Sequence, residues 1–410
     1  MKIENNPIYI PDKIPTRDKS SHLVYAHAPE VTFSYSANFW EQCNASFNKE
    51  GLDRSDSQIV VLTTYPDDVT TKLYRSFSKD SPTRYPVATT LDQEFPDGEL
   101  EMIIDNEAVN AQFVYIVSSI LSERDFSRAR RVADHYKRTL NAKCVTLVSS
   151  FMGATREDKN IGKGDLYKPN TISIRSEIRA LSDFIDRIIV IEPHSSATQA
   201  FAAESNIPLA PLSPWKLMID DLMRNGVYVR RNENLLLTPI TKDNAVVARP
   251  DKGRNLAATR LERYTGMNAV SFDKVRISGQ EVFVYELTPE EQRLVKGRIA
   301  ILYDDEASTM GTIYTIANAL KEYGAEALAA CLVHCKFTPG WERKIIHPLL
   351  TTVLGTDSRR PIGNIQRAGN IRIVSLEPLI RDIIKADIDG INFWRDSFFR
   401  DMILQSYEEE

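Results

Sequence analysis

The chain has 410 residues, 42% of them hydrophobic and 26% charged, which is enough for two or three globular domains with cores of their own. Its formal net charge is −5 at pH 7, which argues against nonspecific nucleic-acid binding because that function needs a basic face. No apolar stretch reaches the roughly 18 residues of a membrane span, and no signal peptide opens the chain, so we expect a cytoplasmic protein that does not bind membranes.

The strand and helix pattern begins after residue 56, and residues 1–56 are interpreted as an irregular N-terminal extension rich in aromatic side chains. Hydrophobic periodicity then predicts strands and helices in alternation. Strands are predicted at residues 59–64, 113–118, 144–149, 188–191, 244–248, 299–303, 327–334 and 371–375. Helices are predicted at residues 69–78, 126–140, 172–184, 255–265 and 313–323.

Apolar strands that alternate with amphipathic helices favour an α/β fold, in which parallel sheets are covered by helices on both faces. The pattern runs twice and is interrupted by the proline-rich stretch IPLAPLSP at residues 207–214. We therefore predict two doubly wound lobes, at residues 57–212 and 213–384. The segment 385–410, with a helix at roughly residues 391–407, is expected to fold back on the first lobe.

The four cysteines are Cys43, Cys144, Cys331 and Cys335, and they form no CxxC pair. Cys331 and Cys335 fall in a strand-like run, which favours buried free thiols in a reducing compartment. A zinc site that uses these two cysteines and His334 lacks a second pair of ligands.

The segment GRIAILYDDEASTMGT, at residues 297–312, carries the most information about function. An apolar strand meets two acids, Asp304 and Asp305, and a small-residue turn leads into a helix. Acids suit the hydroxyl groups of a sugar, while the N–H groups of the turn and the helix N-terminus suit a phosphate. The segment resembles the sugar-phosphate site of the phosphoribosyltransferase fold. The alternative is an ordinary strand–loop–helix unit whose acids cap the helix.

Five further motifs point to one family: FPDGE at residues 95–99, SFMGATREDK at 150–159, IEPHSSATQAF at 191–201, RPDKG at 249–253 and DKVR at 273–276. Taken in this order over about residues 57–385, the motifs resemble those of the ribose-phosphate diphosphokinases, also called phosphoribosyl-pyrophosphate synthetases. The resemblance implies two phosphoribosyltransferase-like lobes. It also implies transfer of the β,γ-diphosphate of ATP to the anomeric hydroxyl of ribose 5-phosphate, with release of AMP.

The resemblance also implies an ATP site, which it assigns to Phe95, Asp97, Glu99, Arg156, Glu157, Asp158 and His194. In the family the FPDGE loop reaches into the site of a neighbouring subunit, so we expect a homo-oligomer built from dimers up to a hexamer. On the sequence alone, Pro96-Asp97-Gly98 also fits a plain hairpin turn. The family has a glutamine where this chain has Glu157.

The resemblance makes Lys274, Arg276 and Arg156 the catalytic cations over the migrating phosphates. Phosphoryl transfer is mostly positioning and charge neutralisation, which these residues would supply. The alternative for Lys274 and Arg276 is a solvated pair on a strand. His194 and Asp251 are expected to bind Mg²⁺, the cofactor that accompanies ATP.

The resemblance assigns sugar-phosphate binding to Asp304, Asp305, Ser308, Thr309, Met310, Gly311 and Thr312. Two of these residues depart from the family pattern, which has an acid at position 308 and a small residue at position 310. Met310 either is neutral or indicates an acceptor with a larger group on its 5-phosphate. The second case resembles relatives that pyrophosphorylate ADP-ribose for NAD rebuilding.

Two alternatives of another class stay open. A non-catalytic regulatory subunit would resemble the enzyme but would have no need for the charged residues named above. A true phosphoribosyltransferase would need a single such lobe and no FPDGE motif.

Overall fold

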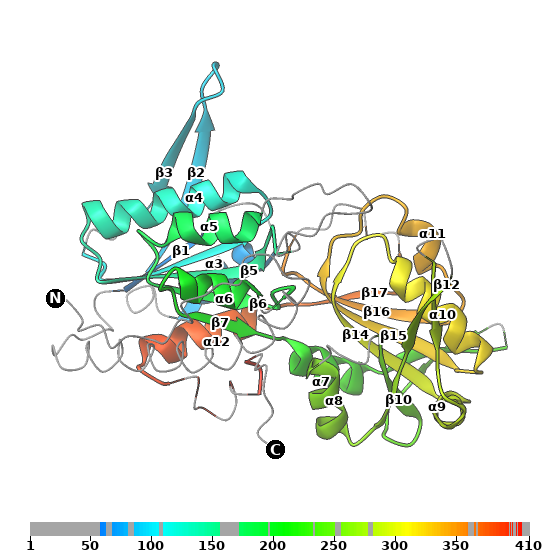
Figure 1. Cartoon of the computed structure of the whole chain (residues 1–410). Coiled ribbons are helices and arrows are strands. Elements are labelled where there is room, and N and C mark those ends of the chain that lie inside the picture. Colours follow the sequence, from blue (N-terminus) through cyan, green and yellow to red (C-terminus); the bar gives the residue numbers. More distant parts are fainter. Residues whose placement is uncertain are drawn as a thin grey trace.

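The computed structural model describes residues 58–62, 68–80, 86–105, 110–155, 172–195, 197–232, 234–250, 256–277, 282–359, 365, 368–392, 394, 396, 399 and 401–403. In this part of the chain, two sheets form two lobes that lie side by side (Figure 1).

The first lobe is built on a seven-stranded sheet with the order β3-β2-β1-β4-β5-β6-β7. Neighbouring strands are parallel except β2 and β3, which form an antiparallel hairpin at one edge. The strands are β1 (Gln58–Leu62), β2 (Val87–Glu94), β3 (Leu100–Asp105), β4 (Phe113–Ile120), β5 (Cys144–Met152), β6 (Arg187–Ile191) and β7 (Leu209–Leu212).

Helices cover both faces of this sheet, as the buried strands require. On one face, α4, α5 and α6 share a buried apolar cluster with the strands. On the other face, α3 packs beside α12, the last of the numbered helices. The bounds are α3 (Asp68–Asp80), α4 (Glu123–Asp134), α5 (Ser173–Leu181), α6 (Ala197–Glu204) and α12 (Glu377–Ile388), and a π-helical turn (His135–Thr139) continues α4.

The second lobe is built on a six-stranded, fully parallel sheet with the order β11-β10-β14-β15-β16-β17. Its strands are β10 (Ala245–Arg249), β11 (Asn268–Ser271), β14 (Ile299–Ala307), β15 (Ala327–Cys335), β16 (Leu350–Thr356) and β17 (Ile371–Val374). Two separate antiparallel hairpins are formed by β8 (Val227–Arg231) with β9 (Asn234–Thr238), and by β12 (Asp273–Ile277) with β13 (Val282–Glu286).

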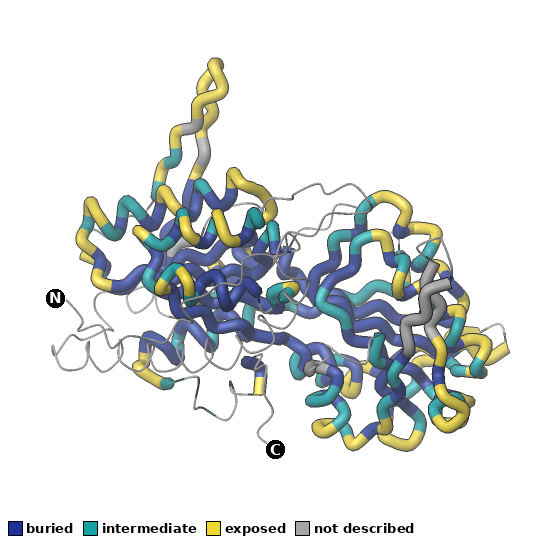
Figure 2. The backbone as a smooth tube through the Cα atoms, viewed as in Figure 1, coloured by how far each residue is buried: buried dark blue, intermediate teal, exposed yellow. Residues whose placement is uncertain are grey.

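The helices of the second lobe also lie on both faces of its sheet. One face is covered by α7 (Trp215–Asn225) and α8 (Leu256–Thr265), whose apolar residues belong to the same buried cluster as α3 and α12 of the first lobe. The other face is covered by α9 (Pro289–Val295), α10 (Gly311–Glu322) and α11 (Glu342–Ile345). One continuous apolar cluster therefore joins the two lobes, and Figure 2 shows the central strands of both sheets as buried.

The helix α12 returns to the first lobe although it follows the last strand of the second. Asp387 of α12 is fully buried and forms a 2.6 Å ion pair with Arg187 of β6. Tyr115 of β4 donates a 2.6 Å hydrogen bond to the same carboxylate. The predicted domain boundary at residue 384 therefore lies inside a helix that packs on the first lobe, and we propose that the crossover precedes Glu377.

The eight predicted strands and five of the six predicted helices are present, with shifts at their ends. The sixth predicted helix, at roughly residues 391–407, lies partly outside the described residues, and Ile403 within it instead forms a β-bridge with Leu212 of β7. One shift matters for the site: β14 was predicted to stop at Tyr303, but it continues to Ala307, so Asp304 and Asp305 lie within the strand. Cys331 and Cys335 are buried in β15, as expected. No helix in the described part of the chain is long and apolar enough to cross a membrane.

Candidate active site between the two lobes

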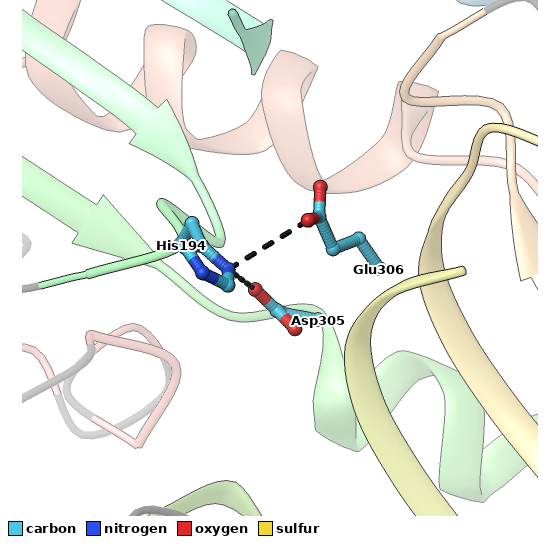
Figure 3. A group of neighbouring side chains, drawn as sticks. All are labelled: His194, Asp305 and Glu306. Atoms are coloured by element: carbon cyan, nitrogen blue, oxygen red, sulfur yellow. Dashed lines mark hydrogen bonds and ion pairs between the residues drawn. The ribbon is translucent and has the colours of Figure 1, made fainter. Parts of the chain in front are cut away.

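The candidate site forms where His194, just after β6 of the first lobe, meets the end of β14 in the second. The Nδ1 atom of His194 lies 2.6 Å from Oδ2 of Asp305 and 3.8 Å from Oε1 of Glu306 (Figure 3). The ligating atoms of these three residues lie within 4.8 Å of one another. An imidazole and two carboxylates are a donor set that fits a divalent cation, and the oxygen atoms suit Mg²⁺.

The two neighbouring aspartates of β14 differ in their electrostatics. Burial and the adjacent charge of Asp305 raise the pKa of Asp304 well above its usual value. Burial also opposes ionisation of Asp305, but its hydrogen bond with His194 outweighs this effect and lowers the pKa of Asp305. Asp305 is therefore the more readily ionised carboxylate of the pair.

Glu306 is a site residue that the sequence reasoning missed. Its carboxylate is buried and forms an ion pair with Lys336, which follows β15, with Nζ 2.5 Å from Oε2. The ion pair with Lys336 holds the Glu306 carboxylate in place beside His194. The only signal in the sequence was a third acid after Asp304 and Asp305, and the pairing with a lysine 30 positions later was not predictable from spacing.

A buried polar network continues behind His194. Glu192 has a left-handed backbone (φ 40°) and is buried, and Tyr303 of β14 donates a 3.0 Å hydrogen bond to its Oε2 atom. The Tyr303 hydroxyl also lies 2.9 Å from Oγ of Ser213. Burial raises the pKa of Glu192 to about 7. The two lobes thus share a hydrogen-bonded carboxyl group directly below the candidate site.

His334 of β15 is the second histidine between the lobes. Its Nε2 atom lies 3.0 Å from the carbonyl oxygen of Glu192, which can only accept, so Nε2 carries the proton. Its Nδ1 atom lies 2.8 Å from Oγ of Ser358. Burial lowers the pKa of His334 to about 4, so the ring is neutral at pH 7. With both nitrogens partnered, His334 is a structural contact and not a zinc ligand.

Ser358 ties the loop after β16 to the first lobe. Its carbonyl oxygen accepts hydrogen bonds from two first-lobe serines, at 3.1 Å from Oγ of Ser119 and 2.7 Å from Oγ of Ser150. All three residues are buried. The contact fixes the position of the second lobe against the carboxyl ends of β4 and β5.

The predicted sugar-phosphate loop lies between β14 and α10. Ser308 contacts Oγ1 of Thr338 at 2.8 Å, and Lys344 donates a 2.8 Å hydrogen bond to the carbonyl oxygen of Thr309. Gly311 opens α10, and the first N–H groups of a helix have no acceptor within it. The turn therefore offers N–H donors, a nearby ammonium group and the positive end of a helix dipole, a combination that suits a phosphate.

The position of the Met310 side chain does not fit the hypothesis, made from the sequence, that this residue shapes an acceptor pocket. Its backbone is left-handed (φ 60°), and its side chain is 2% exposed within the apolar cluster below α10. The side chain therefore points into the core of the second lobe. Its presence in the loop gives no sign of an enlarged acceptor.

Lys274 and Arg276 lie on β12, the first strand of a separate hairpin. The hairpin pairs Lys274 with Tyr285 and Arg276 with Phe283, so the two cationic positions share one face of it. The second strand, β13, contacts α10, which begins at the sugar-phosphate loop. The backbone thus brings the hairpin against α10, while the two side chains lie outside what the structure describes.

The FPDGE residues lie apart from this site. Phe95, Asp97 and Glu99 are all exposed at the tip of the β2–β3 hairpin, which projects away from the body of the first lobe (Figures 1 and 2). The amide of Glu99 donates to Oδ1 of Asp97, and Gly98 has a φ of 89°, so the tip is a tight turn. Within one chain, these three residues do not meet His194 or Asp305.

Four predicted site residues, Arg156, Glu157, Asp158 and Asp251, lie outside the described residues. The described chain stops just before them, in the turn after β5 and just after β10. Their assigned roles remain predictions.

Comparison with known proteins supports the family resemblance. No family model matches the chain. A ribose-phosphate pyrophosphokinase of Campylobacter jejuni is 26% identical over 294 residues, which cover 72% of this chain and 85% of that protein. One from Aquifex aeolicus is 25% identical over 304 residues, which cover 72% of this chain and 86% of that protein.

The fold is likewise found among solved structures. The crystal structure of phosphoribosylpyrophosphate synthetase from Mycobacterium smegmatis superposes with a TM-score of 0.63 at 20% identity, covering 82% of this chain and 100% of that chain. By sequence similarity and by fold, the chain is therefore a relative of the ribose-phosphate pyrophosphokinases, as its motifs predicted.

Proposed function

We propose that the protein transfers the β,γ-diphosphate of Mg²⁺-ATP to the anomeric hydroxyl of ribose 5-phosphate and releases AMP. The observation that carries this proposal is the 2.6 Å contact between His194 and Asp305. This contact brings a candidate nucleotide–metal residue of one lobe to the candidate sugar residues of the other. Similarity to ribose-phosphate pyrophosphokinases over 72% of the chain supports the same reaction.

The acceptor sugar would bind at the carboxyl end of β14. The first-turn N–H groups of α10 and the ammonium group of Lys344 would face its 5-phosphate. The charged carboxylate of Asp305, with Asp304 beside it, would accept hydrogen bonds from the ribose hydroxyls. A sugar bound in this way would turn its anomeric oxygen toward the first lobe, where the nucleotide is expected.

The diphosphate would be neutralised by cations from both lobes. We propose three residues for this role: Lys274 and Arg276 on the β12–β13 hairpin, and Arg156 after β5. Fixed positive groups are needed because they neutralise the negative charge of the migrating diphosphate. His194 and Asp251 are the proposed ligands of Mg²⁺, which would supply further charge neutralisation when bound. Asp305 and Glu306 lie close enough to His194 to bind the same ion.

The adenine contacts are proposed to come from a second copy of the chain. Phe95, Asp97 and Glu99 are exposed on a projecting hairpin and do not approach the site of their own chain. A homo-oligomer would place this tip at a neighbour's site, where Phe95 would stack on the base.

Ribose 5-phosphate is favoured over ADP-ribose as the acceptor because the side chain of Met310 is buried in the core. The altered loop residue that suggested a larger acceptor does not line an open site.

A chromatographic assay of AMP tests the proposal. Purified protein with Mg²⁺-ATP should release AMP with ribose 5-phosphate and much more slowly with ADP-ribose. Lys274→Ala should reduce kcat by roughly 100-fold or more while nucleotide affinity stays similar, since its charge is needed mainly in the transition state. Lys296→Ala, an exposed lysine on the same lobe, is the matched control. No AMP from either acceptor would favour a regulatory subunit.

A further inference from the structure

An exposed apolar strand forms one edge of the β8–β9 hairpin in the second lobe. Strand β9 has the sequence NLLLT, and the exposed fractions of Leu235, Leu236 and Leu237 are 49%, 48% and 57%. Successive side chains of a strand point to opposite faces, so both faces of β9 are uncovered. Among the described residues, β9 pairs with β8 alone, which leaves its other edge open.

The hairpin is fixed to the body of the protein through β8. The side chains of Val227 and Val229 are fully buried in the apolar cluster that joins the lobes. The amide of Tyr228 donates a 3.2 Å hydrogen bond to Oγ1 of Thr352 in β16. The exposed strand β9 is therefore held on a fixed support.

The backbone groups on the open edge of β9 follow from the contact of Tyr228. Because its amide points to Thr352, it points away from β9, so Tyr228 and Leu237 are a non-hydrogen-bonded pair of the hairpin. Leu237, and Leu235 two positions earlier, therefore present their N–H and C=O groups to the open edge. A further strand can bond to these groups.

Strand β9 lacks the features that usually prevent pairing at an edge. Exposed edge strands are commonly protected by charged side chains, by proline or by a bulge. Strand β9 contains no charged residue and no proline, and its pairing with β8 shows no shift of register. An open apolar edge of this kind favours the addition of another strand.

The sequence of β9 is complementary to itself. When two copies of the strand lie antiparallel about Leu236, each Leu235 is opposite a Leu237 of the other copy. Each Asn234 is then opposite a Thr238. The Leu235–Leu237 pairs bond through the backbone groups of the open edge, and the two Leu236 side chains meet at the two-fold axis. A register shifted by two residues would place Leu236 opposite Asn234 or Thr238.

The charges of the hairpin do not oppose this pairing. Arg230 and Arg231 lie on β8, and Arg231 forms a 3.4 Å ion pair with Glu326. Pairing would place the two copies of β8 at the outer edges of one sheet, roughly 14 Å apart at a strand spacing of about 4.8 Å. Since the Debye length is about 8 Å at physiological ionic strength, repulsion between the arginines would be largely screened.

We infer that β9 is a self-association surface, at which a second copy of the chain pairs antiparallel about Leu236. The contact lies on the second lobe, is separate from the tip of the β2–β3 hairpin, and does not depend on the proposed reaction. A strand of 5 residues covers much less than the roughly 800 Å² per partner of a standard interface. The association is therefore weak, with a Kd of about 1–100 µM.

Sedimentation velocity of the full chain over about 1–100 µM tests the inference. Leu236→Lys brings two ammonium groups together at the axis, and its fold should be retained because Leu236 is half exposed. We expect this variant to lose the concentration-dependent step of the wild type, or to shift it by about tenfold or more to higher concentration.

The matched control is Met223→Lys, which changes an apolar residue of α7 with a similar exposed fraction, 43%. The control should associate like the wild type. An unchanged association in Leu236→Lys would overturn the inference, as would an equal loss in the control or a wild type with no concentration-dependent step.

Disulfide trapping tests the identity of the occupant and the register. Leu236→Cys, in a chain that also carries Cys43→Ser, should crosslink two copies under mild oxidation, because residues at the axis face each other with Cβ atoms about 4.5 Å apart. The cysteines Cys144, Cys331 and Cys335 are buried. Met223→Cys in the same background should give little crosslinked dimer. Equal crosslinking of the two variants would overturn the pairing with a second copy, and would leave β9 to an extended strand of another protein.

Discussion

His194 Nδ1 and Asp305 Oδ2 lie 2.6 Å apart, so a short hydrogen bond connects the residues just after β6 in the first lobe with β14 in the second. The residues are 111 positions apart in the sequence. The candidate site therefore exists only when the two sheets have this relative arrangement, which the shared apolar cluster and the contacts of Ser358 maintain.

Asp305→Asn should lower kcat/KM for the acceptor sugar by roughly 100-fold, because it removes the ionised carboxylate beside His194. Asp304→Asn should cost less, since burial and the charge of Asp305 raise the pKa of Asp304 and so already disfavour its ionised form. Steady-state kinetics with varied sugar would measure both. Equal losses in the two variants would contradict the assigned charges.

Met310→Gly should destabilise the protein without changing its acceptor. Glycine relieves the cost of a left-handed backbone, about 1 kcal/mol, but it also removes a buried side chain worth about 2–5 kcal/mol. We expect a net loss of about 1–4 kcal/mol in the free energy of unfolding, measured by denaturant titration. Met310→Leu preserves volume and is the control. A gain in use of ribose 5-phosphate relative to ADP-ribose would restore the pocket hypothesis.

Asp387→Asn should destabilise the first lobe by about 3–5 kcal/mol, because Arg187 is 1% exposed and would lose its carboxylate. Adding Arg187→Met in the same chain should recover much of the loss, since no buried charge would then remain unpaired. Urea unfolding of the single and double variants forms a cycle that gives the coupling energy. Additive effects would show that the ion pair does not anchor α12.

Because of His334, the free energy of unfolding should decrease as the pH is lowered from about 6.5 to about 4. Its folded pKa is lowered to about 4, so the folded protein binds fewer protons there than the unfolded chain. The contribution of His334 to the free energy of unfolding is fully present above the pKa of the unfolded chain, about 6.5, and amounts to about 3 kcal/mol. Urea unfolding at pH 7.5, 5.5 and 4.5 should show a steeper decline for wild type than for His334→Gln. Parallel curves would contradict the lowered pKa.

The sequence was most informative where strands are buried on both faces. The runs that became β4, β5, β14 and β15 are mostly apolar, as is typical of parallel strands under helices. The strand β2 was missed because VATTLDQE mixes polar and apolar residues, which suits an edge hairpin and gives a weak periodic signal.

The site was predictable only in part. The motifs led to His194, Asp305 and the loop before α10, because each sits at the end of a recognisable strand. The partners of these residues were not predictable: Lys336 beside Glu306 and His334 against Glu192 depend on how two sheets are placed together, which local spacing does not encode. The end of β14 was misplaced because two acids resemble a strand terminus, although a neighbouring strand pairs with them.

The projecting β2–β3 hairpin has a consequence for mixtures of variants. If its tip completes the site of another copy, a chain with Phe95→Ala and a chain with Lys274→Ala would each be nearly inactive alone. If equal amounts of the two variants were mixed, dissociated and reassembled, some sites would contain both Phe95 and Lys274. Random assembly would give about a quarter of all sites this composition. Activity would also fall on dilution below the dissociation constant. A single chain of the protein would then lack a complete active site, and only the oligomer would be catalytically active.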